Sequence, residues 1–466
     1  MSFRITRRAL VAVGALAATP AWPQAGKVRP DIRSAAGKTN LQKYARAVRL
    51  MTDLPGSDPR SWVYQWYIHA LPRTLTKEGE LKRLFPIPSP ARSLAETVWE
   101  TCKAHHTGDL SDDFLPWHRL YVMQFEETVR TVLNDPSFVL PYWSYTEAGN
   151  RILPPEFRRK DDPVWGSLYR EHRSSATNSG VPIDAGLNPN PIQADALNQR
   201  TYRRKGAQLG FCAHLDRNLH GRVHVQVGDG VGMGDVPTAA NDPIFWLHHC
   251  DIDRMWMSWN ANGGRNPTDA WADRSFVLPD GRGNKMERMI SSVLDASKLQ
   301  YAYDALLPGP TITAATAGGP VRPVVTLARS STAVALSDDV VQITLSPTGM
   351  KSPKIMGAGL RRQYLVLGTL SANVQPGVLY AVEVRSSAAW FVVGYIHFFD
   401  AVPHGDSGHD HMAMAGAPAA IDREFSFDVT SLTAGKAKLP PIRLRAVRAR
   451  ASAAQPVVGR LELVEN

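Results

Sequence analysis

The stretch LHGRVH places two histidines, His220 and His224, four residues apart. On a helix this spacing brings both rings to one face, one turn apart, where they can bind one metal ion. By itself the pattern is more often a surface pair or a packed pair than a metal site. A third ligand further along the chain would favour the metal interpretation.

The stretch FWLHHCDIDRMW, which begins at Phe245, supplies a candidate third ligand. We expect a helix that is capped by Asp242 and has Pro243 at its first position. On this helix His249 shares a continuous apolar face, whereas His248 shares a more mixed face. A buried imidazole on an apolar face needs a partner, and a metal ion is a suitable one. We therefore predict that His249 binds the metal and that His248 is its neighbour.

A second group of histidines lies upstream. A helix expected over residues 58–72 carries His69 on its inner face. Another helix, expected to begin at Pro116, carries His118. Between them the stretch TCKAHHTGD offers two adjacent histidines. Two groups of histidines without a cluster of carboxylates or thiolates suit copper, zinc or iron, and they predict a pair of metals between facing helices.

These ligands need a framework of helices, and the chain is predicted to divide near residue 305. Residues 26–304 carry helical patterns and are expected to form a mainly α domain, a four-helix bundle that holds the metals in its core. Residues 305–322, rich in Pro, Gly, Thr and Ala, are expected to be a linker. In residues 323–466 nine short runs alternate with a period of two, which predicts an all-β sandwich domain.

Residues 1–25 have the features of an export signal. Arg7 and Arg8 precede an apolar run from Ala9 to Ala18, which is too short to anchor the chain in a bilayer. The arginine pair resembles a twin-arginine signal, and an ordinary signal peptide is the alternative. No other segment is long and apolar enough to cross a membrane. The sequence therefore predicts an exported bacterial protein, either periplasmic or secreted.

Charge and cysteine content bear on two other classes of protein. The formal net charge is +10, but no basic block with interleaved aromatic residues occurs, so nucleic acid is not an expected partner. The 3 cysteines are an odd number, which excludes a fully paired disulfide framework.

Taken in order, FLPWHR, LPYWSY, LHGRVH and DPIFWLHHCDIDRMW resemble the motifs of the type 3 copper family, which comprises tyrosinases, catechol oxidases (polyphenol oxidases) and haemocyanins. The resemblance covers residues 40–304 and implies a mainly α domain with two copper ions that bind O2 and oxidise phenols. By the same resemblance one copper takes His69, His118 and a histidine of CKAHH, and the other takes His220, His224 and His249.

The loop that leads to the first copper departs from the family pattern, because TGDLSDD lengthens it. We favour His105 over His106 as the ligand, since His105 keeps a Cys-x-x-His arrangement with Cys102. Many family members join a cysteine to this histidine by a thioether, usually in a Cys-x-His pattern. Cys102 lies one residue too far for that pattern, which argues against a thioether.

Three residues beside the second copper bear on the substrate. Family members often carry a Glu that holds a water shortly before the first histidine of LHGRVH, and here Asp216 stands in that region, although it is equally consistent with a surface acid. Many tyrosinases have Asn where this chain has Gly221. Both departures predict weak hydroxylation of monophenols. Val236 stands where catechol oxidases often have a bulky Phe, and its small side chain leaves room for a phenol ring.

The runs WFVVGYIHFFDA and REFSFDVTSL resemble the β domain that covers the copper site of latent polyphenol oxidases until it is removed. This resemblance predicts that the C-terminal domain docks on the chain's own active site. Between the two runs, HGDSGHDHMAMAG gathers histidines and methionines. Imidazole and thioether groups suit copper delivery, and a flexible polar loop is the alternative interpretation.

The sequence thus predicts a copper-dependent oxidase that converts phenols and o-diphenols to o-quinones with O2, with o-diphenols favoured. Its partners are small phenolic substrates. An oxygen carrier would use the same dinuclear site without substantial turnover, and a zinc hydrolase could use the same histidines. Both stay open as alternatives on the sequence alone.

Overall fold

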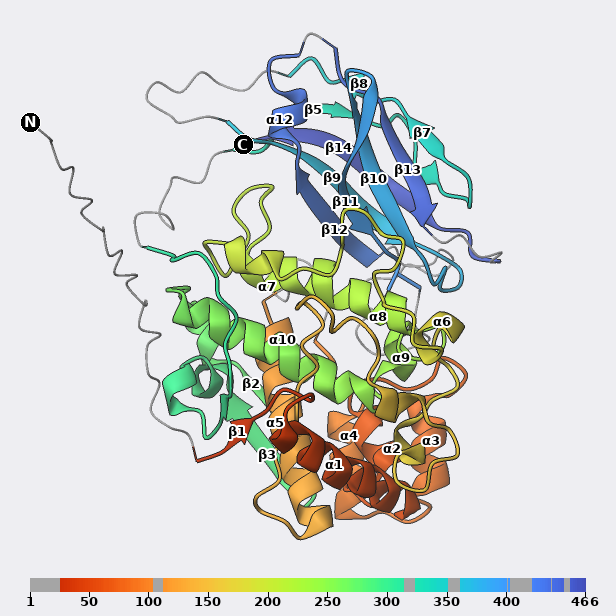
Figure 1. Ribbon diagram of the computed structural model, residues 1–466, viewed down its shortest axis with the longest axis vertical. Coiled ribbons are helices and arrows are strands. Elements are labelled where there is room, and N and C mark those ends of the chain that lie inside the picture. The colour runs from red at the N-terminus through yellow and green to blue at the C-terminus, as the bar shows by residue number, and fades with distance from the viewer. Residues whose placement is uncertain are drawn as a thin grey trace, which may run out of the picture.

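The structure is a computed structural model that describes residues 26–103, 112–313, 323–350, 361–399, 401–402, 421–436, 438–447 and 453–466. Figure 1 shows a part built of helices and, packed against one end of it, a part built of strands. The predicted export signal, His105, His106 and the HGDSGHDHMAMAG stretch lie outside the described residues.

The helical part is built around α5 (Phe114–Leu133) and α10 (Ile244–Ala261), which pack against each other. The π-helix η5 (Leu215–His220) continues directly into α8 (Gly221–Val227). The other α-helices described here are α1 (Ala35–Asp53), α2 (Trp62–Tyr67), α3 (Lys77–Leu84), α4 (Pro90–Val98), α6 (Ser175–Asn178), α7 (Phe211–His214) and α9 (Val236–Ala239). Short 3-10 helices are η2 (Pro155–Arg158), η3 (Gly166–Leu168), η4 (Asp195–Asn198), η6 (Ala270–Asp273), η7 (Ile290–Val293) and η8 (Ala296–Lys298).

The helix α2 is shorter than the predicted helix over residues 58–72. It begins after Ser61, whose Oγ accepts a hydrogen bond from the backbone N–H of Tyr64, and it ends at Tyr67. Serine is a favoured N-cap residue, so this hydrogen bond makes Ser61 the cap and starts the helix at the next residue. His69 consequently lies just beyond the helix rather than on its inner face.

Prolines lie near the starts of α5 and α10, but neither marks the first residue. The helix α5 begins at Phe114, and Pro116 lies in the first turn, where its missing N–H costs no helical hydrogen bond. The helix α10 begins at Ile244, one residue later than expected. Pro243, and not Asp242, occupies the N-cap position, although the Asp242 carboxylate accepts a hydrogen bond from the Ile244 N–H at 3.1 Å.

A buried ion network joins the strand β1 (Val28–Arg29) to both central helices. Arg29 contacts Glu126 of α5 and Asp253 of α10 at N–O distances of 2.9 and 3.3 Å. Arg119 of α5 contacts Asp253 at 2.5 Å, and two tyrosine hydroxyls donate to the same carboxylate. Removal of one member would leave a buried charge without compensation, so the network fixes α5 relative to α10.

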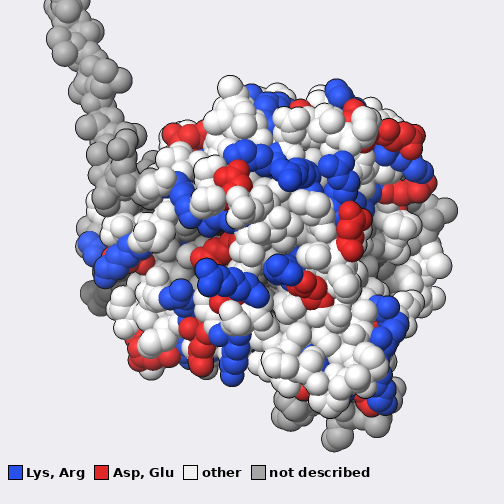
Figure 2. Space-filling view, turned by 90° about the horizontal axis from the view of Figure 1, so that it is seen from below, with Lys and Arg blue, Asp and Glu red and all other residues white. Residues whose placement is uncertain are grey.

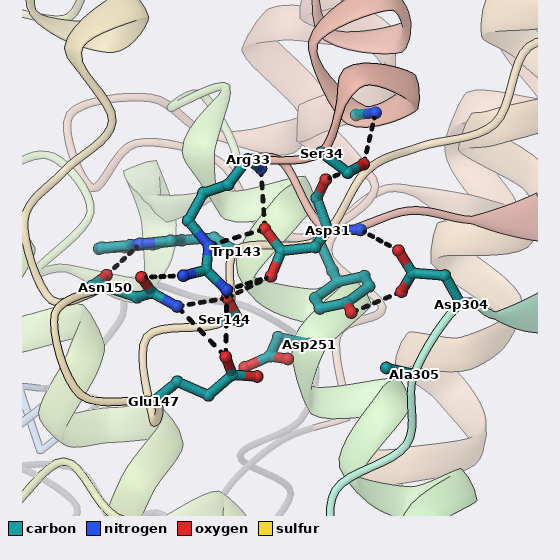
Figure 3. Close-up of polar contacts among 12 residues, drawn as sticks. Asp31, Arg33, Ser34, Trp143, Ser144, Glu147, Asn150, Asp251, Asp304 and Ala305 are labelled. Atoms are coloured by element: carbon teal, nitrogen blue, oxygen red, sulfur yellow. Dashed lines mark hydrogen bonds and ion pairs between the residues drawn. The ribbon is translucent and has the colours of Figure 1, made fainter.

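A second polar network, shown in Figure 3, fastens the loop after α5 to the N-terminal segment. The Asp31 carboxylate accepts hydrogen bonds from Arg33 at 2.9 Å and from Ser144 at 2.6 Å. Arg33 also reaches Glu147 at 3.1 Å, and Glu147 pairs with Arg254 of α10 at 3.1 Å. These contacts hold the loop beside α10, next to the histidine pair.

The strands of the C-terminal part form two antiparallel sheets, with strand orders β11-β10-β13-β7 and β12-β9-β14-β5-β8, and β6 pairs with β14. Buried side chains of both sheets share one apolar core, so the predicted all-β sandwich is confirmed. The predicted run VQITLS divides between two strands. The strands are β5 (Val325–Arg329), β6 (Val334–Ala335), β7 (Val341–Ile343), β8 (Ser346–Pro347), β9 (Gln363–Ser371), β10 (Leu379–Ser386), β11 (Ala389–Ile396), β12 (Ile421–Asp428), β13 (Ile442–Val447) and β14 (Val457–Glu465), with the short helix α12 (Thr430–Thr433) between β12 and β13.

Residues 305–313, the first part of the predicted linker, lie along α10. The Leu307 N–H donates to the Ser258 hydroxyl at 3.0 Å, and the Ile312 N–H donates to the Asn262 carbonyl at 2.6 Å. The exact linker boundaries stay a prediction. The helical part also holds a hairpin of β2 (Ser275–Pro279) and β3 (Lys285–Met289), and β1 pairs in parallel with β4 (Ala302–Tyr303).

Figure 2 shows basic and acidic side chains interspersed on the face seen from below. All three cysteines are free thiols. Among the described helices, none combines the length and apolar character that a membrane span requires.

Candidate metal centre

Four histidines from two helical segments meet in the core beneath the β sandwich. Ring nitrogens of His220, His224, His248 and His249 lie within 4.8 Å of one another, and all four residues are buried. His220 and His224 come from the stretch where η5 passes into α8, and their ring centroids are 4.5 Å apart. The structure therefore brings together the three ligands predicted for the second metal, and it adds His248.

Both histidines of the α10 pair are buried, so burial alone does not show which of them binds a metal ion. The ring of His249 stacks on His118 with centroids 4.4 Å apart, whereas the ring of His248 stacks on His220 at 5.3 Å. The mixed helix face of His248 is covered by the loop after α5, where Tyr145 lies 5.4 Å from its ring. The choice of His249 as the ligand stays a prediction, and its contact with the other histidine group supports it.

The first group consists of His69, Cys102 and His118, whose ligand atoms lie within 4.8 Å of one another. The thiol sulfur of Cys102 is 3.7 Å from Nε2 of His118. Sequence reasoning placed Cys102 near a histidine along the chain but did not place it beside this one. The third histidine predicted for the group, His105 or His106, lies outside the described residues.

Backbone carbonyls orient four of the rings, and the contact of His220 Nδ1 with the Asp216 carbonyl oxygen is the longest at 3.3 Å. Nδ1 of His69 lies 3.1 Å from the Val236 carbonyl oxygen, and Nδ1 of His118 lies 2.8 Å from that of Phe114. Nδ1 of His224 lies 2.7 Å from the carbonyl oxygen of Met233. A ring that donates from Nδ1 carries its lone pair on Nε2, which is the arrangement that metal-binding histidines use.

Some ring nitrogens in this buried site have no hydrogen-bond partner among the described residues: Nε2 of His224 and both ring nitrogens of His248 and His249. A buried polar atom without a partner is costly, and a metal ion removes that cost. Two groups of neutral nitrogen donors fit copper ions by ligand type.

Burial keeps these imidazoles neutral. It lowers the pKa of His118, His224, His248 and His249 well below the ordinary value of 6.5, because charging a ring away from water is unfavourable. Repulsion between neighbouring imidazoles lowers each pKa further. The neutral form is the one that binds metals, so the site is prepared for metal ions near neutral pH.

The three residues predicted to influence the substrate all lie next to this site. Asp216 is buried in the π-helix, and its Oδ1 is 3.2 Å from Nδ1 of His220. Gly221 is the first residue of α8, and Val236 is the first residue of α9 and is buried. Asp216 is therefore not a surface acid. The π-helix itself, which places Asp216 in this position, had no signal in the sequence.

A residue of the β sandwich also reaches the site. The ring of Phe399, just beyond β11, stacks on His224 with centroids 4.3 Å apart and an interplanar angle of 16°. It also meets His220 edge-on at 5.8 Å, and it is 1% exposed. Phe399 belongs to the run WFVVGYIHFFDA, but the strand pattern of this run does not distinguish it from its neighbours.

Comparisons with known proteins match the same region. The family model of the common central domain of tyrosinase matches residues 59–208 and 170–262. Tyrosinase HcTyr1 of Hahella sp. (strain CCB-MM4) is 31% identical over 353 residues, which cover 68% of this chain and 72% of that protein. Polyphenol oxidase II of Ipomoea batatas is 26% identical over 60% of this chain and 50% of its own length, so the chain spans about half of this plant relative.

Two solved structures share the whole architecture. The structure of latent apple tyrosinase has a TM-score of 0.60 at 21% identity and covers 96% of this chain and 98% of its own. Recombinant latent aurone synthase, a polyphenol oxidase, has a TM-score of 0.60 at 18% identity and covers 96% of this chain and 90% of its own. Both likenesses show the fold, a helical core followed by a β domain.

Proposed function

Because the chain belongs to the tyrosinase family, we propose that it uses two copper ions and O2 to oxidise phenols and o-diphenols to o-quinones. The observation that carries this proposal is the meeting of two groups of buried imidazoles, with the rings of His118 and His249 stacked at 4.4 Å. Copper ions held by these rings supply the redox chemistry between the phenol and O2.

The protein's own contribution is to hold neutral imidazoles in place and to exclude water. The carbonyls of Val236, Phe114 and Met233 fix three rings, and the surrounding aromatic core leaves the histidines almost unexposed. The histidines therefore act as ligands and not as acids or bases. The six proposed ligands are His69, His105 (with His106 as the alternative), His118, His220, His224 and His249.

We further propose that o-diphenols are better substrates than monophenols. A monophenol must lose its proton before it can bind a metal, and a base or a held water near the site helps to remove that proton. Asp216 is the acid that stands shortly before His220 in the sequence. Its carboxylate Oδ1 lies 3.2 Å from Nδ1 of His220. A buried carboxylate packed beside a proposed ligand is less available to take a proton from the substrate.

The β sandwich is proposed to be a lid that keeps the enzyme latent. Phe399 stacks on His224, where a flat substrate ring would need to approach. Arg73 of the helical part donates to the Val402 carbonyl of the sandwich at 3.1 Å and to the Asp235 carboxylate at 2.7 Å. Because a tethered domain has a high effective concentration, on the order of mM for a short flexible linker, even weak contacts of this kind keep it docked.

A second set of contacts joins the sandwich to the helical part. The carboxylate of Glu424, in β12, pairs with Arg204 of the helical part at 2.5 Å. The Glu424 carbonyl accepts a hydrogen bond from Arg217 at 2.8 Å, and the Ser426 hydroxyl donates to the Ala207 carbonyl at 2.6 Å. These contacts bridge the two parts at buried or half-buried positions.

The activity is tested by comparing a monophenol with its o-diphenol on copper-loaded protein, following quinone absorbance. We expect turnover of both, with the o-diphenol faster. A protein that binds O2 reversibly without turnover would be an oxygen carrier, and activity that requires zinc would indicate a hydrolase. The control is His224→Ala protein treated with copper in the same way, because it should lose turnover of both substrates.

The lid is tested by proteolysis within residues 305–322 of the full chain. Cleavage should raise activity on bulky catechols more than on small ones, because small substrates pass a partial cover more easily. Cleaved protein that retains its copper and gains no activity on any catechol would show that the sandwich is not a lid.

We also propose that the chain is exported through its first 25 residues. The supporting observation is the arginine pair followed by a short apolar run. Fractionation of bacterial cells that express the chain, with and without an Arg7→Lys and Arg8→Lys double change, tests this. The unchanged chain should appear in the periplasm or medium, and the double change should retain it in the cytoplasm if the twin-arginine route is used.

A further inference from the structure

Gly221 has a helical backbone that does not require glycine. Its φ and ψ angles are −64° and −32°, which are ordinary α-helical values open to every residue. Glycine at such a position is less favourable than alanine, because it loses more conformational freedom on folding. Another constraint must therefore account for the absence of a side chain beside His220.

The β sandwich supplies that constraint. A Cβ atom added to Gly221 would lie 2.1 Å from Cε1 and 2.3 Å from Nε2 of His397. Both distances are far below van der Waals contact, so the imidazole occupies the space that any side chain at position 221 would take. His397 follows β11, two positions before Phe399 in the chain, so the two rings enter the helical part together.

The His397 ring cannot easily move aside. It is fully buried, and its Nε2 lies 2.8 Å from the carbonyl oxygen of Arg217, to which it donates. The ring also meets the ring of Phe425 in β12, with centroids 5.1 Å apart and an interplanar angle of 86°. A side chain at position 221 would have to break the Arg217 hydrogen bond or lift the sandwich.

We propose that the missing side chain of Gly221 leaves the space in which His397 docks, which we call the docking socket. A side chain at position 221 would therefore prevent the sandwich from closing over the site. The inference rests on the proposed function only in treating the docked sandwich as a lid. It assigns to the position next to the metal ligand a role in holding the sandwich, in addition to any effect on the substrate. The same glycine thereby links the docking of the sandwich to the geometry of the metal site.

The test is amide hydrogen exchange, followed by mass spectrometry, on the full copper-loaded chain. The variants are Gly221→Ala, His397→Ala and the double change, and Gly26→Ala is the control because a Cβ there would meet no atom within 4 Å. Residues 204–210 report docking, since Ser426 and Asn466 of the sandwich contact them. The helix α5 reports the integrity of the core.

We expect exchange at residues 204–210 to rise roughly tenfold or more in Gly221→Ala, with α5 unchanged. The control should match the unchanged chain. His397→Ala alone loses the Arg217 hydrogen bond but introduces no clash, so its exchange should rise less than that of Gly221→Ala. In the double change, removal of the imidazole makes room for the added methyl group, so exchange should fall back to the level of His397→Ala alone. This rescue separates a docking role from general damage to the helix.

Unchanged exchange in Gly221→Ala would overturn the proposal, as would a double change that stays as open as Gly221→Ala. Turnover of an o-diphenol is measured separately on the same samples. Opening without a gain in turnover would support the socket while contradicting the lid function. A gain in turnover without faster exchange at residues 204–210 would contradict the socket.

Discussion

The two groups of histidines are built in different ways. The second group stands on two continuous helical stretches, where the sequence spacing of His220 and His224 and the pair on α10 set the geometry. The first group is gathered from the residue after α2, the segment at Cys102 and the first turns of α5. Local helix periodicity therefore defines one half of the site, whereas tertiary contacts define the other.

The largest expected effect concerns the pair on α10. His249→Ala should lose one copper ion and lower turnover by more than the roughly 10–100-fold that loss of an outer-shell partner costs. His248→Ala should retain both copper ions. Metal analysis and o-diphenol turnover on the two variants decide this. The reverse pattern of copper loss would show that His248, and not His249, is the ligand.

The first group offers a matching experiment in its loop. His105→Ala should lose copper and nearly all turnover, and His106→Ala should keep both, if the Cys-x-x-His arrangement selects the ligand. Equal copper loss in both variants would contradict the choice of His105. A Cys102→Ser variant, measured alongside for copper content, reports whether the thiol that lies 3.7 Å from His118 contributes.

The β sandwich contacts the second group of histidines through Phe399, whose ring stacks on His224. Phe399→Ala should raise the activity of the uncleaved chain several-fold on bulky catechols, because the stacked ring leaves His224. Phe391→Ala is the matched control, since this phenylalanine of β11 is 47% exposed and points away from the core. Equal activity of both variants would remove Phe399 from the explanation.

Acid should destabilise the copper-free protein through the same buried histidines. Below pH 6.5 the unfolded chain takes up protons at His118, His224, His248 and His249, whereas the folded protein does not. The free energy of unfolding should therefore fall as the pH is lowered from about 6.5, by up to ~1.4 kcal/mol per pH unit for each such group. Urea titrations of the copper-free protein between pH 7 and 5 measure this slope.

Substitution of one of these histidines isolates its share of the slope. His248→Gln should flatten the pH dependence, and His172→Gln, at a side chain that is 72% exposed, should not change it. A slope that is identical in both variants would mean that other groups control the acid response.

The smallest expected effect concerns Asp216. Asp216→Glu lengthens the side chain by one methylene, so the carboxylate can leave its present position 3.2 Å from Nδ1 of His220. The ratio of monophenol to o-diphenol turnover should rise a few-fold in protein whose linker has been cleaved. Gly221→Asn should raise the same ratio, and cleaved protein is needed because the lid would otherwise alter both rates. An unchanged ratio in both would dissociate these positions from substrate choice.

A feature of this molecule can be predicted from the sequence where local contacts determine it, and cannot be predicted where tertiary contacts do. The β sandwich and the His220–His224 pair follow from periodicity, because alternation and a spacing of four are local properties. The burial of His248 depends on the loop at Tyr145, and the position of Asp216 depends on a π-helix. The helix before His69 starts later than expected because Ser61 caps it, and the pattern of apolar residues does not indicate this cap.

The residues that join the two parts were the least visible in the sequence. Phe399 and His397 sit at the end of a regular strand pattern, and nothing in that pattern marks them as reaching into another domain. Gly221 was visible as a departure from tyrosinases, but its spatial cause lies more than a hundred residues away along the chain. Interdomain complementarity is a property of the folded surface and not of any short stretch.

Arg73 makes one guanidinium serve both the sandwich and the segment that leads into Val236, whose carbonyl meets His69. Domain exchange between relatives would break this arrangement, since a transplanted sandwich brings its own backbone opposite an arginine positioned for another. Chimeras of this chain should therefore keep Arg73, Asp235 and the segment at Val402 together as a single inherited unit. A library that shuffles the two halves at the linker would otherwise recover chains whose sandwich is not held by Arg73.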